Sequence, residues 1–146
     1  RIFEFIPRGV FSDSVVDVYP QAIAKGERVV AHVATGKWRE LSTLQRYLDI
    51  SLEMLREMGA SLSVGQDCQI SDSASVVDSI LWDRVTVGSN AKMKRAILAD
   101  DVQVAGNDVI ENAVVVPLSL IEGKTPPAKA LRGRVQGENF VVSLSG

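Results

Sequence analysis

Residues 70–115 read ISDSASVVDSILWDRVTVGSNAKMKRAILADDVQVAGNDVIENAVV, and this stretch repeats every seventeen residues. Within one repeat the large apolar residues are separated by steps of six, five and six, a spacing that does not follow the 3.6-residue period of an α-helix. Smaller residues form a second series two positions earlier. Three short strands per turn, each turning one large and one small side chain into a narrow interior, account for both series. The large series contains Ile70, Val87, Val104, then Val76, Met93, Ile110, then Leu81, Leu98, Val115, and the small series contains Cys68, Val85, Val102, Ala74 and Ala91.

The spacing, together with Val64-Gly65 and Val87-Gly88, resembles the hexapeptide repeat of left-handed parallel β-helices over roughly residues 62–118. The alternative is an antiparallel meander with a chance periodicity. Nine apolar positions in one register favour the β-helix, although Asp108 interrupts the small-residue series. We therefore expect a mainly β fold with a three-coil left-handed parallel β-helix at residues 60–118.

Composition narrows the function classes. The chain has 146 residues, a net charge of −2 and one cysteine, Cys68, at an inward small position, where an inert core thiol is expected. A lone cysteine forms no internal disulfide, which agrees with a cytoplasmic location. Basic residues are scattered, so we expect no nucleic-acid partner. No apolar run approaches 18 residues, so neither a membrane span nor a signal peptide is expected. The chain starts with Arg1, and we expect a longer parent protein.

Residues 42–59 carry the pattern of an amphipathic helix. Ser42 and Gln45 have the spacing of a capping box, a leucine stripe follows, and Gly59 is placed to end the helix in a left-handed conformation. Open β-helix ends expose strand edges, so we expect this helix to link the preceding segment to the coils and to cap the end of the stack. The stripe consists of Leu44, Leu48, Leu52 and Leu55.

The two flanking regions lack the repeat. Residues 1–41 contain two apolar stretches, 1–10 and 28–33, that are typical of strands. In residues 119–146, a loop with Pro126 and Pro127 precedes a strand-like stretch at 137–144. We expect this tail to fold back and cover the far end of the coils.

Six short motifs before and at the helix are similar, in order, to the end of the catalytic domain of sugar-nucleotide pyrophosphorylases, most closely the mannose-1-phosphate guanylyltransferase-like subgroup. They are Ile6-Pro7-Arg8-Gly9, Asp17-Val18-Tyr19-Pro20, Lys25-Gly26, Val30-Ala31-His32, Gly36-Lys37-Trp38 and Tyr47-Leu48. The resemblance implies that residues 1–41 are the remnant of an α/β nucleotidyltransferase domain. The parent enzyme would join a nucleoside triphosphate to a sugar 1-phosphate, release pyrophosphate and use Mg²⁺.

The same resemblance implies the partners. They are the chain's own upstream catalytic domain, a nucleotide sugar in the parent, and further copies of the chain contacting through the β-helix. The Gly-rich nucleotide loop of the family has no counterpart here, since Gly9 and Gly26 stand alone. The 146 residues by themselves are therefore expected to be inactive, with a role in assembly and regulation.

Glu40 is the one candidate site residue. The family motif Trp-x-Asp-Ile-Gly-Thr reads Trp38-Arg39-Glu40-Leu41-Ser42-Thr43, so the resemblance puts Glu40 where an aspartate helps to hold Mg²⁺. The competing interpretation is an acidic residue in the first turn of the helix, favoured by the helix dipole. Catalytic residues are not identified.

Two other function classes stay open. A pyrophosphorylase-like regulatory scaffold without catalysis would fit Glu40 and Ser42, which replace the family's Asp and Gly. A hexapeptide acyltransferase is a weaker alternative because the only histidine, His32, precedes the coils and is expected to be structural. At the coil corners, Asp83, Asp100 and Asp101 are expected to cap turns, and Trp82 to contact a neighbouring chain or domain.

Overall fold

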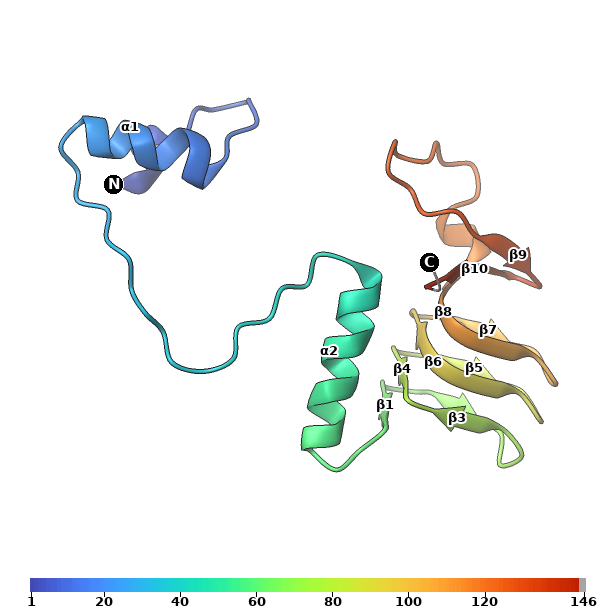
Figure 1. Cartoon of the computed structure of the whole chain (residues 1–146). Coiled ribbons are helices and arrows are strands. Elements are labelled where there is room, and N and C mark those ends of the chain that lie inside the picture. Colours follow the sequence, from blue (N-terminus) through green and yellow to red (C-terminus); the bar gives the residue numbers. More distant parts are fainter. Residues whose placement is uncertain (145–146) are drawn as a thin grey trace. The chain divides into compact units, whose positions relative to one another are not determined.

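The computed structural model describes residues 1–144 and divides the chain into two compact units, Arg1–Trp38 and Arg39–Gly146. The second unit consists of one helix, a stack of short strands and a C-terminal hairpin (Figure 1). Its elements are α2 (Leu44–Glu57), β1 (Leu62–Val64), β2 (Gln69–Ile70), β3 (Ser75–Val77), β4 (Ser79–Leu81), β5 (Thr86–Val87), β6 (Lys92–Leu98), β7 (Gln103–Val104), β8 (Val109–Pro117), the 3-10 turn η3 (Leu118–Leu120), β9 (Arg134–Gln136) and β10 (Asn139–Ser143).

The strands form a parallel β-solenoid of three coils, which confirms the predicted fold class. One face contains β1, β4 and the ends of β6 and β8; a second contains β3 and the starts of β6 and β8; a third contains β2, β5 and β7. Every parallel partner lies seventeen residues further along the chain, as in Ile70↔Val87 and Met93↔Ile110. The sequence period is thus the length of one coil.

The predicted inward residues make the core of the solenoid. Leu98, Val85, Val102 and Val115 are fully buried, and the other large residues of coils two and three are nearly so. In the first coil, Ile70 and Val76 are only half-buried, because β2 and β3 have a strand partner on one side only. Full burial of one such side chain contributes about 1.5–3 kcal/mol, so the last two coils supply most of the stabilisation.

The coil corners use left-handed backbone conformations at non-glycine residues. All eight such residues have φ between 47° and 67°, and all follow the seventeen-residue spacing. Asn and Asp tolerate this region because their short side chains bond to nearby backbone, and they supply six of the eight. The three series are Asp67, Arg84, Asp101; Asp78, Arg95, Asn112; and Asn90, Asn107.

The helix α2 begins one residue later than expected. Thr43, not Ser42, is the N-cap: its Oγ1 accepts a hydrogen bond from the Arg46 amide at 3.1 Å. Gln45 takes no part in a capping box, because its side-chain amide donates to Asp49. At the other end Gly59 has φ +74°, the Ala60 amide donates to the Leu55 carbonyl and the Gly59 amide to that of Arg56, as in a Schellman motif.

The same helix lies along one side of the coil stack and not across its end, which corrects the expected capping position (Figure 1). Its buried residues are Leu48, Leu52 and Leu55. They pack against an outward ladder of one residue per coil on the face of β4, β6 and β8. The ladder is Ile80, Ile97 and Val114, again seventeen residues apart. A helix that follows this ladder must run beside all three coils.

The tail forms an antiparallel hairpin on the last coil. β10 pairs with β8, from Asn139↔Pro117 to Ser143↔Ala113, and β9 pairs with β10. Val141 joins the solenoid core, and the buried Asn139 donates its side-chain amide to the Gln103 carbonyl at 2.7 Å. The hairpin thereby covers the open edge of β8. Of the predicted 119–146 tail, residues 145 and 146 lie outside the described residues.

The first unit contains η1 (Ile2–Phe5), η2 (Ser14–Val18) and α1 (Tyr19–Ala24), and only Val18 and Ala22 are buried hydrophobic residues. The predicted strands at 1–10 and 28–33 are wrong: the first forms the short helix η1, and the second is extended without a strand partner. Apolar residues alone do not make a strand when no neighbour takes its backbone hydrogen bonds. Among residues 1–144, no helix has both the length and the apolar character needed to span a bilayer.

Candidate functional site

Glu40 lies on the extended segment that leads into α2. Its carboxylate pairs with the Arg46 guanidinium, which also contacts the Ser42 hydroxyl at 3.1 Å. Because the helix begins at Leu44, Glu40 does not lie in its first turn, and the dipole interpretation of this residue is wrong. Within the described part of the chain, no group of three or more Asp, Glu, His or Cys side chains is placed to hold a metal ion. Glu40 therefore has no second ligand here, and its role in binding Mg²⁺ stays a prediction.

His32 lies on the same kind of extended, exposed backbone and belongs to the first unit. The coils contain no imidazole, because the chain has only this one histidine. No coil residue can thus act as the histidine base that acyl transfer in hexapeptide enzymes would require.

Corner carboxylates hold neighbouring coils together. Asp83 Oδ1 accepts the Gln66 amide at 2.8 Å, and Asp100 Oδ1 accepts the Asp83 amide at 3.0 Å. Each of these bonds reaches back seventeen residues, or one coil. The prediction that Asp83 and Asp100 cap turns is confirmed, and their role is structural.

The Asp101 carboxylate instead pairs with the guanidinium group of Arg84. Arg84 donates from Nε to Oδ1 at 2.6 Å and from Nη2 to Oδ2 at 3.0 Å, a bidentate geometry. This hydrogen bonding raises the pKa of Arg84 and lowers the pKa of Asp101. Arg84 also lies 3.5 Å from Asp100, so one arginine serves two acidic side chains.

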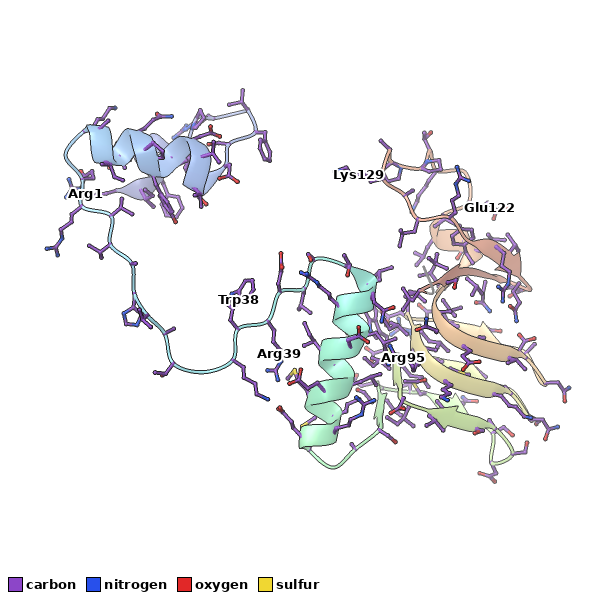
Figure 2. All side chains as sticks on the ribbon, viewed as in Figure 1. Arg1, Trp38, Arg39, Arg95, Glu122 and Lys129 are labelled. Carbon is purple, nitrogen blue, oxygen red and sulfur yellow. The ribbon has the colours of Figure 1, made fainter. Side chains whose placement is uncertain are left out.

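Two ion pairs connect the solenoid to α2. In one the arginine belongs to the solenoid, and in the other it belongs to the helix. Arg95 Nη2 lies 2.7 Å from Asp49 Oδ1, and Arg56 Nη2 lies 3.6 Å from Asp78 Oδ1 (Figure 2 labels Arg95). Hydrogen bonds from Gln45 and then from Arg95 lower the pKa of Asp49. The pairs fix the direction of the helix across its apolar contact.

A cleft of about 690 Å³ opens where the tail hairpin returns to the last coil. Its apolar wall contains Trp82, Pro117, Leu118 and Leu120, of which Trp82 is 45% exposed. Four carboxylates line it, from Asp100, Asp101, Glu122 and Glu138, and none of its thirteen lining residues is Lys or Arg. Such a cleft disfavours phosphate groups and favours a cationic occupant with some apolar surface.

The sequence indicated only half of this cleft. Trp82, Asp100 and Asp101 were recognisable as corner residues, whereas Glu122 and Glu138 were not expected to meet them. They do so because β10 pairs with β8 and places the 137–139 turn beside η3. The strand-like stretch at 139–143 after Gly137 predicts a hairpin, but the sequence does not show which strand of the solenoid it pairs with.

Comparison with known families agrees with the solenoid. Residues 55–124 match the family model described as GlmU-like, C-terminal hexapeptide. This segment is thus similar to a GlmU-like hexapeptide-repeat domain. The match begins in the last turn of α2 and ends just past η3, so it includes all three coils. It supports the hexapeptide-repeat sugar nucleotidyltransferase family. No curated protein matches the chain.

Proposed function

We propose that the chain is the C-terminal region of a sugar-1-phosphate nucleotidyltransferase and that its solenoid serves assembly and regulation of the parent enzyme. The parent would convert a nucleoside triphosphate and a sugar 1-phosphate into a nucleotide sugar and pyrophosphate, in the manner of the mannose-1-phosphate guanylyltransferase-like subgroup. One observation carries the proposal: a GlmU-like hexapeptide domain at 55–124 directly follows the motifs between Ile6 and Leu48 that resemble the end of a pyrophosphorylase domain.

The chemistry of nucleotidyl transfer needs more groups than the chain supplies. Catalysis of this kind depends on positioned cations around the phosphates. Octahedral Mg²⁺ needs several oxygen ligands, and Glu40 is the only ligand proposed in this chain. The residues described here do not form a Mg²⁺ site by themselves. Mg²⁺ and the nucleotide sugar belong to the proposed parent, together with its upstream catalytic domain.

A pyrophosphate-release assay tests the proposal. The 146-residue chain, given Mg²⁺, nucleoside triphosphates and sugar 1-phosphates, should release no pyrophosphate above background. The longer parent should release it at an enzymatic rate under the same conditions. Turnover by the 146 residues would show that the chain contains a complete active site.

Glu40 has its own test in the parent. Glu40→Gln should raise the Mg²⁺ concentration needed for half-maximal rate if the carboxylate ligates the ion. Arg46→Met removes the ion-pair partner of Glu40 and should leave that Mg²⁺ requirement unchanged or lower it. Equal Mg²⁺ requirements in Glu40→Gln and the unaltered parent would leave Glu40 with only its ion-pair role.

A non-catalytic regulatory scaffold is the second candidate. It is favoured by Glu40 and Ser42, which stand where the family has Asp and Gly. A parent that binds a nucleotide sugar by calorimetry but forms none would establish the scaffold. Acyl transfer is the least supported class, since the coils lack histidine.

A further inference from the structure

The acidic cleft beside the last coil is followed in the sequence by a basic loop. Residues 123–134, immediately after the cleft residue Glu122, read GKTPPAKALRGR and contain four basic residues and no acidic one. All of this loop is exposed. The Lys124 amide donates a hydrogen bond to the Ile121 carbonyl just before the loop, and the Ala130 amide donates to the Pro127 carbonyl within it. Figure 2 shows Lys129 on this loop, where the loop projects past the strands, and Glu122 near its base.

Within one chain, the basic loop and the acidic cleft do not neutralise each other through ion pairs. Among residues 1–144, none of the loop cations Lys124, Lys129, Arg132 and Arg134 forms an ion pair. Glu122 and Glu138 on the cleft likewise have none, and Asp100 and Asp101 share the single Arg84. The loop thus does not close on the cleft of its own chain.

The apolar parts are also complementary. Pro126 and Pro127 restrict the backbone of residues 125–127, and a turn from Pro127 to Ala130 follows, so the loop loses less entropy when it docks. Extended proline-containing segments bind grooves with an exposed aromatic wall, and the cleft offers Trp82 beside Leu118 and Leu120. Leu131, 57% exposed, supplies an apolar side chain between the cations. An arginine over the indole would add a cation–π contact.

We propose that the 123–134 loop of one copy of the chain docks in the acidic cleft of a second copy, and that the second copy returns the contact. A two-fold dimer requires such reciprocity: where the loop of one subunit meets the cleft of the other, the reverse contact also forms. The loop follows the cleft residue Glu122 directly, so in the proposed dimer both contacts would lie close to the two-fold axis. This inference specifies the surface for the self-assembly proposed above and rests on that proposal.

A charge-swap experiment on the whole 146-residue chain tests the contact. The cleft variant is Glu122→Lys with Glu138→Lys, and the loop variant is Lys129→Glu with Arg132→Glu. The control, Lys92→Glu with Lys94→Glu, makes the same charge change as the loop variant at two exposed residues of β6 that belong neither to the cleft nor to the loop. Sedimentation velocity gives the dimer dissociation constant, and circular dichroism verifies that each variant is folded.

Each swap should weaken the dimer at least about tenfold, whereas the control should stay within about threefold of the unaltered chain. An equal mixture of the two swapped variants should form heterodimers with near-original affinity, since the altered loop then meets the altered cleft and the unaltered loop meets the unaltered cleft. Raising the salt to about 1 M should weaken the unaltered dimer, because ions screen charges over about 3 Å there.

Three results would overturn the inference. A dimer unaffected by both swaps would place the interface elsewhere and leave the proposed assembly standing. Folded variants that lose the dimer and do not recover on mixing would exclude the reciprocal contact. A strictly monomeric unaltered chain would refute this contact and the proposed self-assembly together.

Discussion

Residues 1–38 and 39–146 contain similar kinds of apolar residues and use them in different ways. In the second unit, aliphatic side chains recur every seventeen residues and meet one another in a continuous core, and Leu98 and Val115 have no exposed surface. In the first unit, Phe3, Phe11 and Val33 are at least 80% exposed, and only Val18 and Ala22 are buried. The amount of apolar surface is therefore less important than its register, because a repeat brings every apolar side chain next to its equivalent.

The difference also bears on function. Exposed apolar residues on this scale are typical of a surface that another part of a protein covers. The first unit carries most of the motifs that resemble a nucleotidyltransferase domain, and in the parent proposed above the upstream catalytic domain would cover these residues. The solenoid, by contrast, buries its apolar residues in a core made by its own coils.

The largest expected effect separates the two units. Leu98→Ala removes a fully buried side chain from the middle coil and should lower the free energy of unfolding by about 2–5 kcal/mol. Phe11→Ala, at a residue 93% exposed in the first unit, should change it by no more than about 0.5 kcal/mol. Urea unfolding followed by circular dichroism measures both. Equal losses would mean that the first unit is as well packed as the coils.

A glycine inside the repeat should give the next effect. A Cβ at Gly88 would lie 2.6 Å from the Gly106 backbone nitrogen, in the following coil. Gly88→Ala must therefore push two coils apart and should cost about 1–3 kcal/mol.

Gly106→Ala is the graded control, because its Cβ would lie 3.1 Å from the Ser89 carbonyl oxygen and needs a smaller adjustment. The thermal midpoint should fall further for Gly88→Ala. The opposite ranking would show that the coils are not spaced as described.

The helix cap gives a smaller effect and distinguishes two adjacent residues. Thr43→Ala should cost about 1 kcal/mol, because the Arg46 amide loses its acceptor. Ser42→Ala should leave the urea midpoint nearly unchanged, since the Ser42 hydroxyl bonds the Arg46 side chain and caps no amide. If Ser42→Ala were the costlier change, the helix would begin where the sequence alone indicated.

The smallest effect concerns pH and the helix contact. The pKa of Asp49 is lower in the folded chain than in the unfolded one, owing to Gln45 and Arg95. Its stabilisation is thus present above the unfolded pKa of about 3.9 and is lost as the pH falls through the folded value.

Asp49→Asn should therefore reduce stability at pH 7 by less than about 1 kcal/mol, as for partly exposed ion pairs, and by almost nothing near pH 2. Asp72→Asn, at an exposed aspartate on a coil turn, is the matched control and should leave the stability unchanged at both pH values. Urea midpoints at the two pH values provide the comparison. A loss that persists undiminished at low pH would exclude the ion pair as its cause.

The sequence predicted the solenoid interior because period and side-chain size both report the same register. It missed the outward ladder of Ile80, Ile97 and Val114, although each lies directly before an inward residue. Paired apolar residues on one strand of every coil indicate a face covered on both sides, and that signal would have placed α2 beside the stack.

Other features depended on contacts that no local pattern encodes. Thr43, and not Ser42, is the N-cap. The backbone conformation of the chain as it enters the helix determines which of the two hydroxyls reaches a first-turn amide. Residues 28–33 have a strand's composition but no partner strand. The acidic cleft needed the pairing of β10 with β8, which joins residues from opposite sides of the tail loop.

Hydrogen exchange of the whole chain, read by mass spectrometry, tests the contrast between the two units most directly. Amides of β6 and β8, which are bonded on both sides, should be the slowest to exchange, and amides of residues 28–36 should exchange as fast as those of an unfolded peptide. Protection at residues 28–33 equal to that of β6 would contradict the account, since those amides would then belong to a sheet.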